Sequence, residues 1–377
     1  MPISDIVDAV SNSCTVWRTL RDIEPLCLNG RAQYITGNAA VIFTVKHEGR
    51  LKILKCYTRH NPYLKDIYGS LFYPRELCVM AITGNIMWVD CLLYDRIEGV
   101  SLDNALCQTQ SAQDIEHLAK AFDQMAYQLL SNGKTHGDLK PENIIVTPSS
   151  EMIPIDYDSA FMPAFAGKQS VEIGTAAYQH PARNLQFFDA HLDDYSIAII
   201  STLLHAATID YSIVEHFRRT HEFPFHPRNI IMGKCSKLDF YIEEFARRAD
   251  AVHYRIAKML TSPWPRLFNL KHTLSFSQMD SATDSIENAS LEHENGLWGC
   301  RNTNDWIIPP LFDSGFEPSE GYIIASLSGY THLLSLKERR VVHSFSKGTT
   351  AKPVKNGIIV IRDSSGQRQS IPLTTLL

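Results

Sequence analysis

The stretch Thr135–Val146, THGDLKPENIIV, decides how the rest of the chain is interpreted. It starts with polar and charged residues and ends in an apolar run, a pattern that predicts a loop leading into a strand. Asp138, Lys140 and Asn143 place a carboxylate, a cation and an amide oxygen in one short loop. Phosphoryl transfer needs these groups to accept the proton of the attacking hydroxyl, to offset phosphoryl charge and to bind Mg²⁺. A solvated turn with a helix cap is the alternative, and the ordered set of side chains argues against it.

The triplet His136-Gly137-Asp138, together with Lys140 and Asn143, resembles the catalytic loop of eukaryotic-type protein kinases, H-R-D-L-K-x-x-N. The resemblance implies an ATP- and Mg²⁺-dependent enzyme in which Asp138 is the catalytic base, Lys140 stabilises developing charge and Asn143 binds Mg²⁺. It gives His136 a supporting role. Lys140 favours Ser/Thr over tyrosine as the acceptor, because tyrosine kinases carry Ala-Ala-Arg in this region.

Gly137 stands where most regulated kinases have an arginine that pairs with a phosphorylated activation loop. We therefore expect activity that does not depend on phosphorylation of Ser170 or Thr175. His-Gly-Asp also occurs in aminoglycoside and choline phosphotransferases, which usually lack the Lys-Pro-Glu that follows here. A small-molecule phosphotransferase therefore stays as an alternative function.

A second acidic motif, Asp156-Tyr157-Asp158, follows a short strand predicted at Met152–Ile155 and resembles the D-F-G motif. The resemblance makes Asp156 a Mg²⁺ ligand, and a register in which Asp158 binds the metal stays open. Further on, Gly174-Thr175 resembles part of an activation segment, in which Thr175 would hydrogen-bond to the catalytic loop. Asp193 begins a stretch that resembles D-x-W-S and would bind the backbone of the same loop.

The residues from Gln33 to Thr58 predict three strands with tight turns, as in a kinase small lobe. The first turn contains Gly37, where kinases carry a glycine-rich loop over the ATP phosphates. Lys55, on the third strand, resembles the lysine that holds the α- and β-phosphates.

The acidic partner of Lys55 is open at this stage. The next helix is predicted at Pro62–Tyr73, and its only acid is Asp66. Glu76 has a plausible offset but leads directly into the next predicted strand. The partner is therefore Asp66, Glu76 or absent.

The segment 92–102, LLYDRIEGVSL, resembles the kinase hinge, and the resemblance assigns adenine contacts to the backbone near Asp95 and Ile97. A helix is predicted at 111–132, because apolar residues recur at helical spacing and Ser111 with Asp114 forms a capping-box pattern. An apolar run at Ile197–Ala207 predicts a buried helix.

The C-terminal part changes character. Residues 275–295 are rich in Ser, Asp, Glu and Asn and predict a flexible acidic linker. Gly296-Leu297-Trp298-Gly299, followed by Trp306–Asp313, resembles the WG repeat of bacterial proteins, and weaker copies begin at Gly329 and Gly357. Such repeats predict a small antiparallel β module that is more often a partner-binding face than an enzyme.

The bulk properties set limits on these interpretations. The chain has 377 residues, 44% hydrophobic and 20% charged, with a net charge of −5, which gives no reason to expect nucleic-acid binding. Scattered cysteines and the absence of an apolar run near the ~18 residues of a membrane span favour a cytoplasmic protein without a membrane span or a zinc–cysteine site. The first residues lack a signal-peptide pattern.

Together these patterns predict an α+β protein with a two-lobed, bacterial protein kinase-like fold and a small all-β WG-repeat domain. The expected boundaries are an N-terminal extension at 1–28, a kinase-like domain at 29–270, a linker at 271–294 and the repeats at 295–377. A pseudokinase scaffold that holds nucleotide or nothing is the second hypothesis for function.

Overall fold

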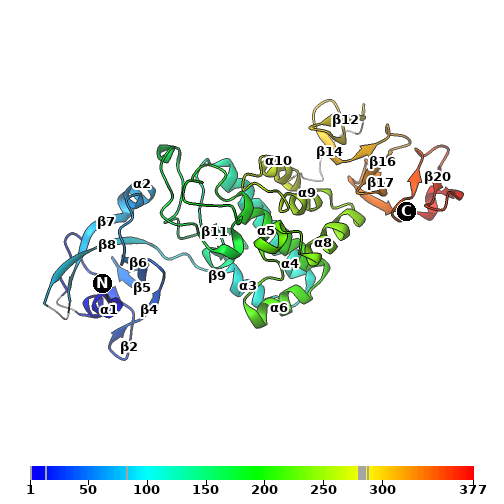
Figure 1. Cartoon of the computed structure of the whole chain (residues 1–377). Helices are drawn as coiled ribbons and strands as arrows, with labels where there is room; N and C mark the ends of the chain where they lie inside the picture. Colours follow the sequence, from blue (N-terminus) through cyan, green and yellow to red (C-terminus); the bar gives the residue numbers. More distant parts are fainter. Residues whose placement is uncertain (1, 13–14, 82–83, 279–285, 287) are drawn as a thin grey trace.

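The computed structural model describes residues 2–12, 15–81, 84–278, 286 and 288–377. The predicted α+β class is confirmed: the described residues form ten α-helices and several antiparallel sheets. A β-rich N-terminal part, a helical middle part and a C-terminal β part follow one another along an elongated molecule (Figure 1). In the described part of the chain, none of the helices is both long and apolar enough to span a membrane.

The N-terminal part is a curled antiparallel sheet with the strand order β1-β5-β6-β8-β7, and β4 pairs with β5. Apolar residues on one face of the sheet pack against helix α1, whose Ile6, Val7 and Val10 are buried there. Residues of the predicted N-terminal extension, 1–28, therefore belong to the core of this sheet. The elements are α1 (Ile3–Ser11), β1 (Glu24–Pro25), β2 (Cys27–Leu28), β3 (Arg31–Ala32), β4 (Tyr34–Thr36), β5 (Ala40–His47), β6 (Arg50–Tyr57), β7 (Phe72–Met80) and β8 (Ile86–Asp95).

The helix predicted at Pro62–Tyr73 is shorter in the structure. The α-helix α2 spans Leu64–Tyr68, and a 3₁₀ turn, Gly69–Leu71, follows it. Gly69 ends the α-helix because its φ of 58° lies outside the helical region. Phe72 and Tyr73 then start strand β7, where aromatic side chains are favoured.

The helical middle part is built around α5, whose body is buried on nearly every side. Helix α4 packs against it, and the capping box between Ser111 and Asp114 is confirmed at the start of α4. A small sheet with the order β11-β10-β9 carries the loops of the site described below. The elements are β9 (Val100–Ser101), α3 (Leu102–Gln108), α4 (Ala112–Ser131), β10 (Ile144–Val146), β11 (Met152–Pro154), α5 (Asp194–Ile209), α6 (Ser212–Thr220), α7 (Pro227–Ile231), α8 (Ser236–Arg247), α9 (Ala251–Met259) and α10 (Leu270–Ser275).

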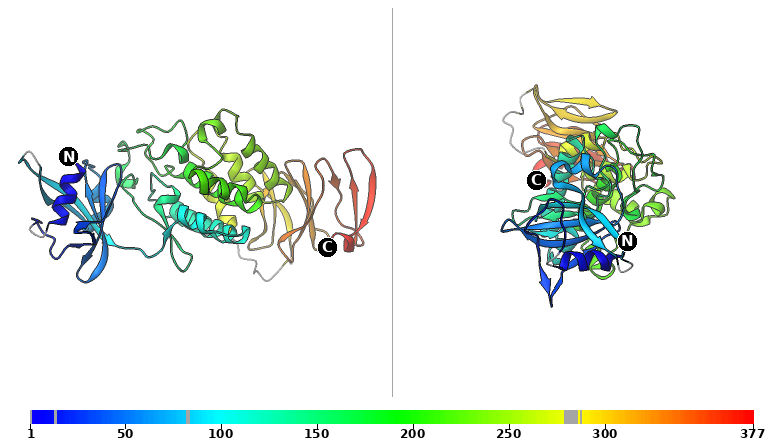
Figure 2. Two further views of the ribbon diagram at one scale, coloured as in Figure 1. Left: turned by 90° about the horizontal axis from the view of Figure 1, so that it is seen from below. Right: turned by 90° about the vertical axis from the view of Figure 1, so that its left-hand side faces the viewer.

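The C-terminal part consists of three small antiparallel sheets that lie side by side along the molecule (Figure 2). The three glycines that mark the repeats, Gly296, Gly329 and Gly357, lie in hairpin turns, and each has positive φ together with the residue before it. The strands are β12 (Ser290–Glu294), β13 (Leu297–Arg301), β14 (Trp306–Phe312), β15 (Ser314–Gly315), β16 (Tyr322–Leu327), β17 (Tyr330–Ser335), β18 (Arg340–Ser344), β19 (Thr350–Ala351), β20 (Ile358–Arg362) and β21 (Arg368–Pro372).

Gly299 shows why a Trp-Gly pair precedes an Ile-Pro-Pro run. A Cβ on Gly299 would lie 2.6 Å from the carbonyl oxygen of Ile308 and 2.6 Å from the nitrogen of Pro310. Only glycine lets β13 and β14 approach this closely.

The predicted linker, 271–294, contains regular structure at both ends. Helix α10 packs against α4 and α9, and β12 pairs with β13. Residues 279–285 and 287 of the predicted linker lie outside the described residues.

The C-terminal part shares an apolar core with the helical part, and Ile308, Leu311 and Phe312 of β14 belong to the same buried cluster as α5 and α9. At the edge of this contact, Arg255 of α9 donates to the carbonyl oxygen of Leu311 and pairs with Asp313 at 2.7 Å. The two parts are therefore packed together rather than only tethered.

Candidate functional site

A cleft of about 810 Å³ is lined by residues of both the N-terminal sheet and the helical part. The sheet side includes Gly37 of the β4–β5 turn and Lys55 of β6. The helical side supplies the loop after α4 and the loop after β11. Seven of the residues predicted from the sequence line this one cleft: Gly37, Lys55, Ile97, Asp138, Lys140, Asn143 and Asp156.

The loop before β10 holds Asp138, Lys140 and Asn143 in a connected arrangement. The Asp138 carboxylate accepts a hydrogen bond of 2.6 Å from the Thr175 backbone N–H, and its other oxygen lies 3.6 Å from the Lys140 ammonium. Lys140 also donates to the Thr175 hydroxyl at 3.2 Å. Asn143 donates to the carbonyl of Asp138 at 2.9 Å, which leaves the amide oxygen as its available ligand atom. Thr175 thus lies against the loop, as the resemblance of Gly174-Thr175 to part of an activation segment implies.

Two buried side chains fix the backbone of this loop. Asp193, just before α5, accepts hydrogen bonds from the backbone N–H groups of His136 and Gly137. The Nδ1 of His136 accepts from the backbone N–H of Asp138, so its Nε2 carries the proton and donates to the Ile155 carbonyl at 2.6 Å. His136 therefore connects the loop to the residue before Asp156.

Lys55 is buried and contacts two carboxylates, Asp156 and Asp158, at 2.5 Å each. Burial alone would lower the pKa of the Lys55 ammonium, but the two carboxylates raise it above its ordinary value. Burial likewise would raise the pKa of Asp156, and the Lys55 charge brings that pKa below its ordinary value. Lys55 and Asp156 are therefore both charged at neutral pH.

The sequence did not predict how Asp158 is held. Its carboxylate accepts from the Tyr57 hydroxyl at 2.9 Å and the Tyr68 hydroxyl at 2.8 Å, and its carbonyl accepts from Asn61 at 2.8 Å. Asp158 is thus fastened to the N-terminal sheet and to α2. The backbone of Asp156 has a φ of 67°, in the left-handed region. Its side chain points across the cleft to Lys55.

Neither acid considered as the partner of Lys55 reaches it. Asp66 is exposed on α2. Glu76 is buried, and its carboxylate accepts from the backbone N–H groups of Thr19 and Leu20 at 2.7 and 2.6 Å and from the Thr19 hydroxyl at 2.6 Å. Glu76 fastens the N-terminal segment to β7.

Because Glu76 holds the N-terminal segment to β7, we expect Glu76→Gln to lower the stability of the protein. The amide oxygen of the replacement can still accept from both backbone N–H groups, but it carries no charge, and hydrogen bonds to a charged acceptor are the stronger ones. We therefore expect the free energy of unfolding to fall by about 1–3 kcal/mol. Thermal unfolding followed by circular dichroism measures this, with Asp66→Asn as a neutral control. An unchanged midpoint together with weaker nucleotide binding would show instead that Glu76 serves Lys55.

Of the residues predicted to bind ATP, Gly37, Lys55 and Ile97 line the cleft and Asp95 does not. It lies at the exposed end of β8, where its carboxylate pairs with Lys52 at 2.9 Å and the pair lowers its pKa. Arg96 and Ile97 line the cleft in its place. Successive side chains of a strand point to opposite faces, so Lys52 and Lys55 lie on opposite faces of β6. Lys55 faces the cleft, and Asp95 pairs with Lys52 on the other face.

Gly137 is required by a close approach that the sequence did not show. Its φ is 86°, and a Cβ would lie 2.1 Å from the carbonyl oxygen of Ser159. On the other side, the buried Arg183 guanidinium donates to the Gly137 carbonyl at 2.9 Å. An arginine at position 137 would therefore collide with the segment that follows Asp158.

Gly137→Ala is expected to destabilise the protein by more than the ~1–3 kcal/mol typical of a strained backbone position. Gly133→Ala is the matched control, because Gly133 has a similar φ of 67° and a Cβ there meets nothing within 4 Å. Differential scanning fluorimetry of both variants separates the steric clash from the backbone cost. Equal unfolding midpoints would contradict the close approach.

Several residues that line the cleft carry groups that can bind phosphate oxygens or a divalent ion. Its volume falls in the ~300–1,000 Å³ range of small-molecule sites. Lys55 can bind phosphate oxygens, while Asn143 and Asp156 offer the oxygen ligands that Mg²⁺ prefers. Apolar side chains that can cover a purine ring line both walls: Ile35, Ile42, Ile53, Tyr94, Ile145 and Ile155.

Comparison with known proteins gives no family. No protein-family model matches the chain, and no curated protein matches it.

Proposed function

We propose that the chain is a bacterial protein kinase-like phosphotransferase, with a two-lobed kinase-like part that runs from helix α1 to helix α10 and WG-type repeats that begin at strand β12. The observation that carries this proposal is the convergence of Lys55, Asp138, Lys140, Asn143 and Asp156 on one cleft, although Lys55 and Asp156 are far apart in the sequence. A scaffold has no need of all five.

Asn143 and Asp156 would hold Mg²⁺, and the bound ion would offset the negative charge on the phosphates of ATP. Lys55 positions the α- and β-phosphates. Asp138 orients the acceptor hydroxyl and takes its proton. Lys140, held between Asp138 and Thr175, offsets the charge on the transferred phosphoryl group. Lys140 favours a Ser/Thr hydroxyl of a protein as the acceptor, and the C-terminal repeats serve to bind a protein partner.

A nucleotide-binding or nucleotide-free scaffold is the second candidate, and one observation favours it. Asp156 and Asp158 both pair with the Lys55 ammonium, so a bound phosphate must compete with a carboxylate for this cation. A small-molecule phosphotransferase, the third candidate, differs from both because its acceptor is a small hydroxyl compound.

Incubation of the full chain with Mg²⁺-ATP, followed by peptide mass spectrometry, tests the proposal. Phosphate on Ser or Thr of the chain or of an added protein acceptor is the expected result. Nucleotide binding without any transfer supports the scaffold, and transfer only to added small hydroxyl compounds supports the third function.

A further inference from the structure

A cluster of metal-ligating side chains lies outside the cleft, in the interior of the helical part. It consists of Asp123 on α4, His205 on α5 and His253 on α9. One Asp123 carboxylate oxygen, Oδ2, lies 2.9 Å from Nε2 of His205 and 2.9 Å from Nε2 of His253. The ligand atoms of the three side chains all lie within 4.8 Å of one another. Asp123 and His253 are buried.

A second set of contacts orients these ligands. Both carboxylate oxygens of Asp250 lie 2.8 Å from Nδ1 of His253, so Nδ1 carries a proton and Nε2 faces Asp123. The hydroxyl of Ser201 donates to Oδ1 of Asp123 at 2.7 Å, which leaves Oδ2 toward the imidazoles. Histidine ligands of metals typically donate their second nitrogen to a carboxylate in this way.

The two imidazole rings are unusually close. Their centroids are 3.3 Å apart with an interplanar angle of 19°, compared with the ~4.5–7 Å that aromatic pairs usually adopt. A network of hydrogen bonds alone would need both Nε2 atoms to be protonated and to donate to the same carboxylate oxygen. A cation bound by the three atoms would also bring them to one point, with neither Nε2 atom protonated.

We propose that Asp123, His205 and His253 bind a divalent transition-metal ion. Two imidazole nitrogens and one carboxylate oxygen suit Zn²⁺, whereas Mg²⁺ and Ca²⁺ prefer oxygen ligands throughout. Three protein ligands leave a fourth position for water, and the partly exposed His205 gives solvent access to it. Binding requires both Nε2 atoms to be free of protons, so any proton they carry passes to solvent.

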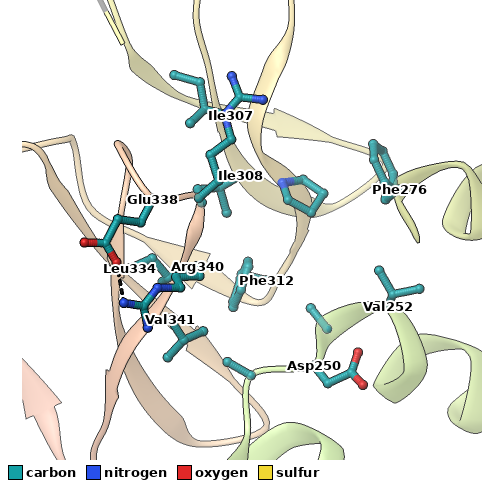
Figure 3. Close-up of a pocket in the computed structure, with 14 residues that line it drawn as sticks. Asp250, Val252, Phe276, Ile307, Ile308, Phe312, Leu334, Glu338, Arg340 and Val341 are labelled. Carbon is teal, nitrogen blue, oxygen red and sulfur yellow. Dashed lines mark ion pairs between the residues drawn. The ribbon is translucent and has the colours of Figure 1, made fainter. Parts of the chain in front are cut away.

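The site would fasten three helices beneath the C-terminal β part. Helix α9 carries both His253 and Arg255, the residue that contacts Leu311 and Asp313. Asp250 also lines a cavity of about 340 Å³ between α9 and strands β14 and β18. Figure 3 shows Asp250 at this cavity, in which Phe312, Arg340 and the Glu338–Arg340 ion pair also lie. The ion would therefore stabilise the face of α9 on which the repeats pack.

The test uses the full chain purified without a histidine tag and without chelator. Plasma emission spectrometry measures bound zinc, and Co²⁺ added to the metal-depleted protein reports the ligand field by its visible absorption. His205→Gln removes the partly exposed ligand, and the control His117→Gln changes an exposed histidine on α4. Asp250→Asn tests the positioning residue.

Wild type and His117→Gln are expected to bind Zn²⁺ and to give the intense bands of four-coordinate Co²⁺. Folded His205→Gln is expected to lose both, and Asp250→Asn to bind about 10- to 100-fold more weakly. Chelation should lower the unfolding midpoint of wild type but not of His205→Gln. Folded wild type that takes up neither ion, or His205→Gln that binds as tightly as wild type, would overturn the proposal.

Discussion

Asp138→Asn is expected to reduce phosphoryl transfer by on the order of 10²–10⁴-fold, the usual effect of removing a positioned general base. The amide cannot take the proton of the acceptor hydroxyl. Its oxygen can still accept the hydrogen bond from the Thr175 backbone, which is 2.6 Å long in wild type, so the loop keeps its shape. Nucleotide affinity is therefore expected to stay within a few-fold of wild type, since Asp138 does not hold the phosphates.

Single-turnover kinetics with Mg²⁺-ATP measure this effect, and nucleotide titration measures affinity in parallel. Asp66→Asn, on the exposed face of α2, is the control for a change of charge elsewhere in the N-terminal part. A rate for Asp138→Asn equal to that of wild type would remove Asp138 from the mechanism.

Lys55→Met is expected to lower both stability and nucleotide binding. The substitution leaves the carboxylates of Asp156 and Asp158 without their shared cation, and breaking a buried ion pair from one side costs about 3–5 kcal/mol. Lys52→Met is the matched control on the same strand, because its pair with Asp95 lies at the surface, where solvent screens the two charges.

The double variant Lys55→Met/Asp158→Asn separates the effect of unpaired carboxylates on stability from the effect of the lost Lys55 ammonium on nucleotide binding. Neutralising Asp158 removes one of the two unpaired charges, and the Tyr57 and Tyr68 hydroxyls can still donate to its amide oxygen. We expect the double variant to recover part of the lost stability but none of the nucleotide binding. Thermal unfolding and nucleotide titration provide the two measurements. A double variant less stable than Lys55→Met would contradict this charge balance.

Local patterns predicted much of the fold. Strand-like runs separated by tight turns predicted strands β5 and β6, and helical spacing with a Ser111–Asp114 capping box predicted α4. The glycines of the repeats correspond to hairpin turns because positive φ favours glycine at those positions. These features depend on neighbouring residues, so the sequence displays them directly.

Contacts between distant residues could not be predicted in this way. Glu76 accepts hydrogen bonds from the backbone of Thr19 and Leu20. No local pattern connects these residues, so the sequence leaves Glu76 open as a partner of Lys55. Asp158 is held by Tyr57 and Tyr68, which lie in the N-terminal part.

The Asp123–His205–His253 cluster could not be predicted from the sequence for the same reason. Its members come from three helices and have no regular spacing in the sequence. Only the packing of α4, α5 and α9 brings them together.

The most direct test of the account is isothermal titration of ATP into the full-length protein, with and without Mg²⁺, for wild type and Asp156→Asn. The account predicts that wild type binds ATP more tightly when Mg²⁺ is present, because Asn143 and Asp156, which line the cleft, would hold an ion that offsets the phosphate charge. It predicts that Asp156→Asn loses this Mg²⁺ dependence. ATP that does not bind to folded wild type under either condition would contradict the assignment of the cleft as a nucleotide site.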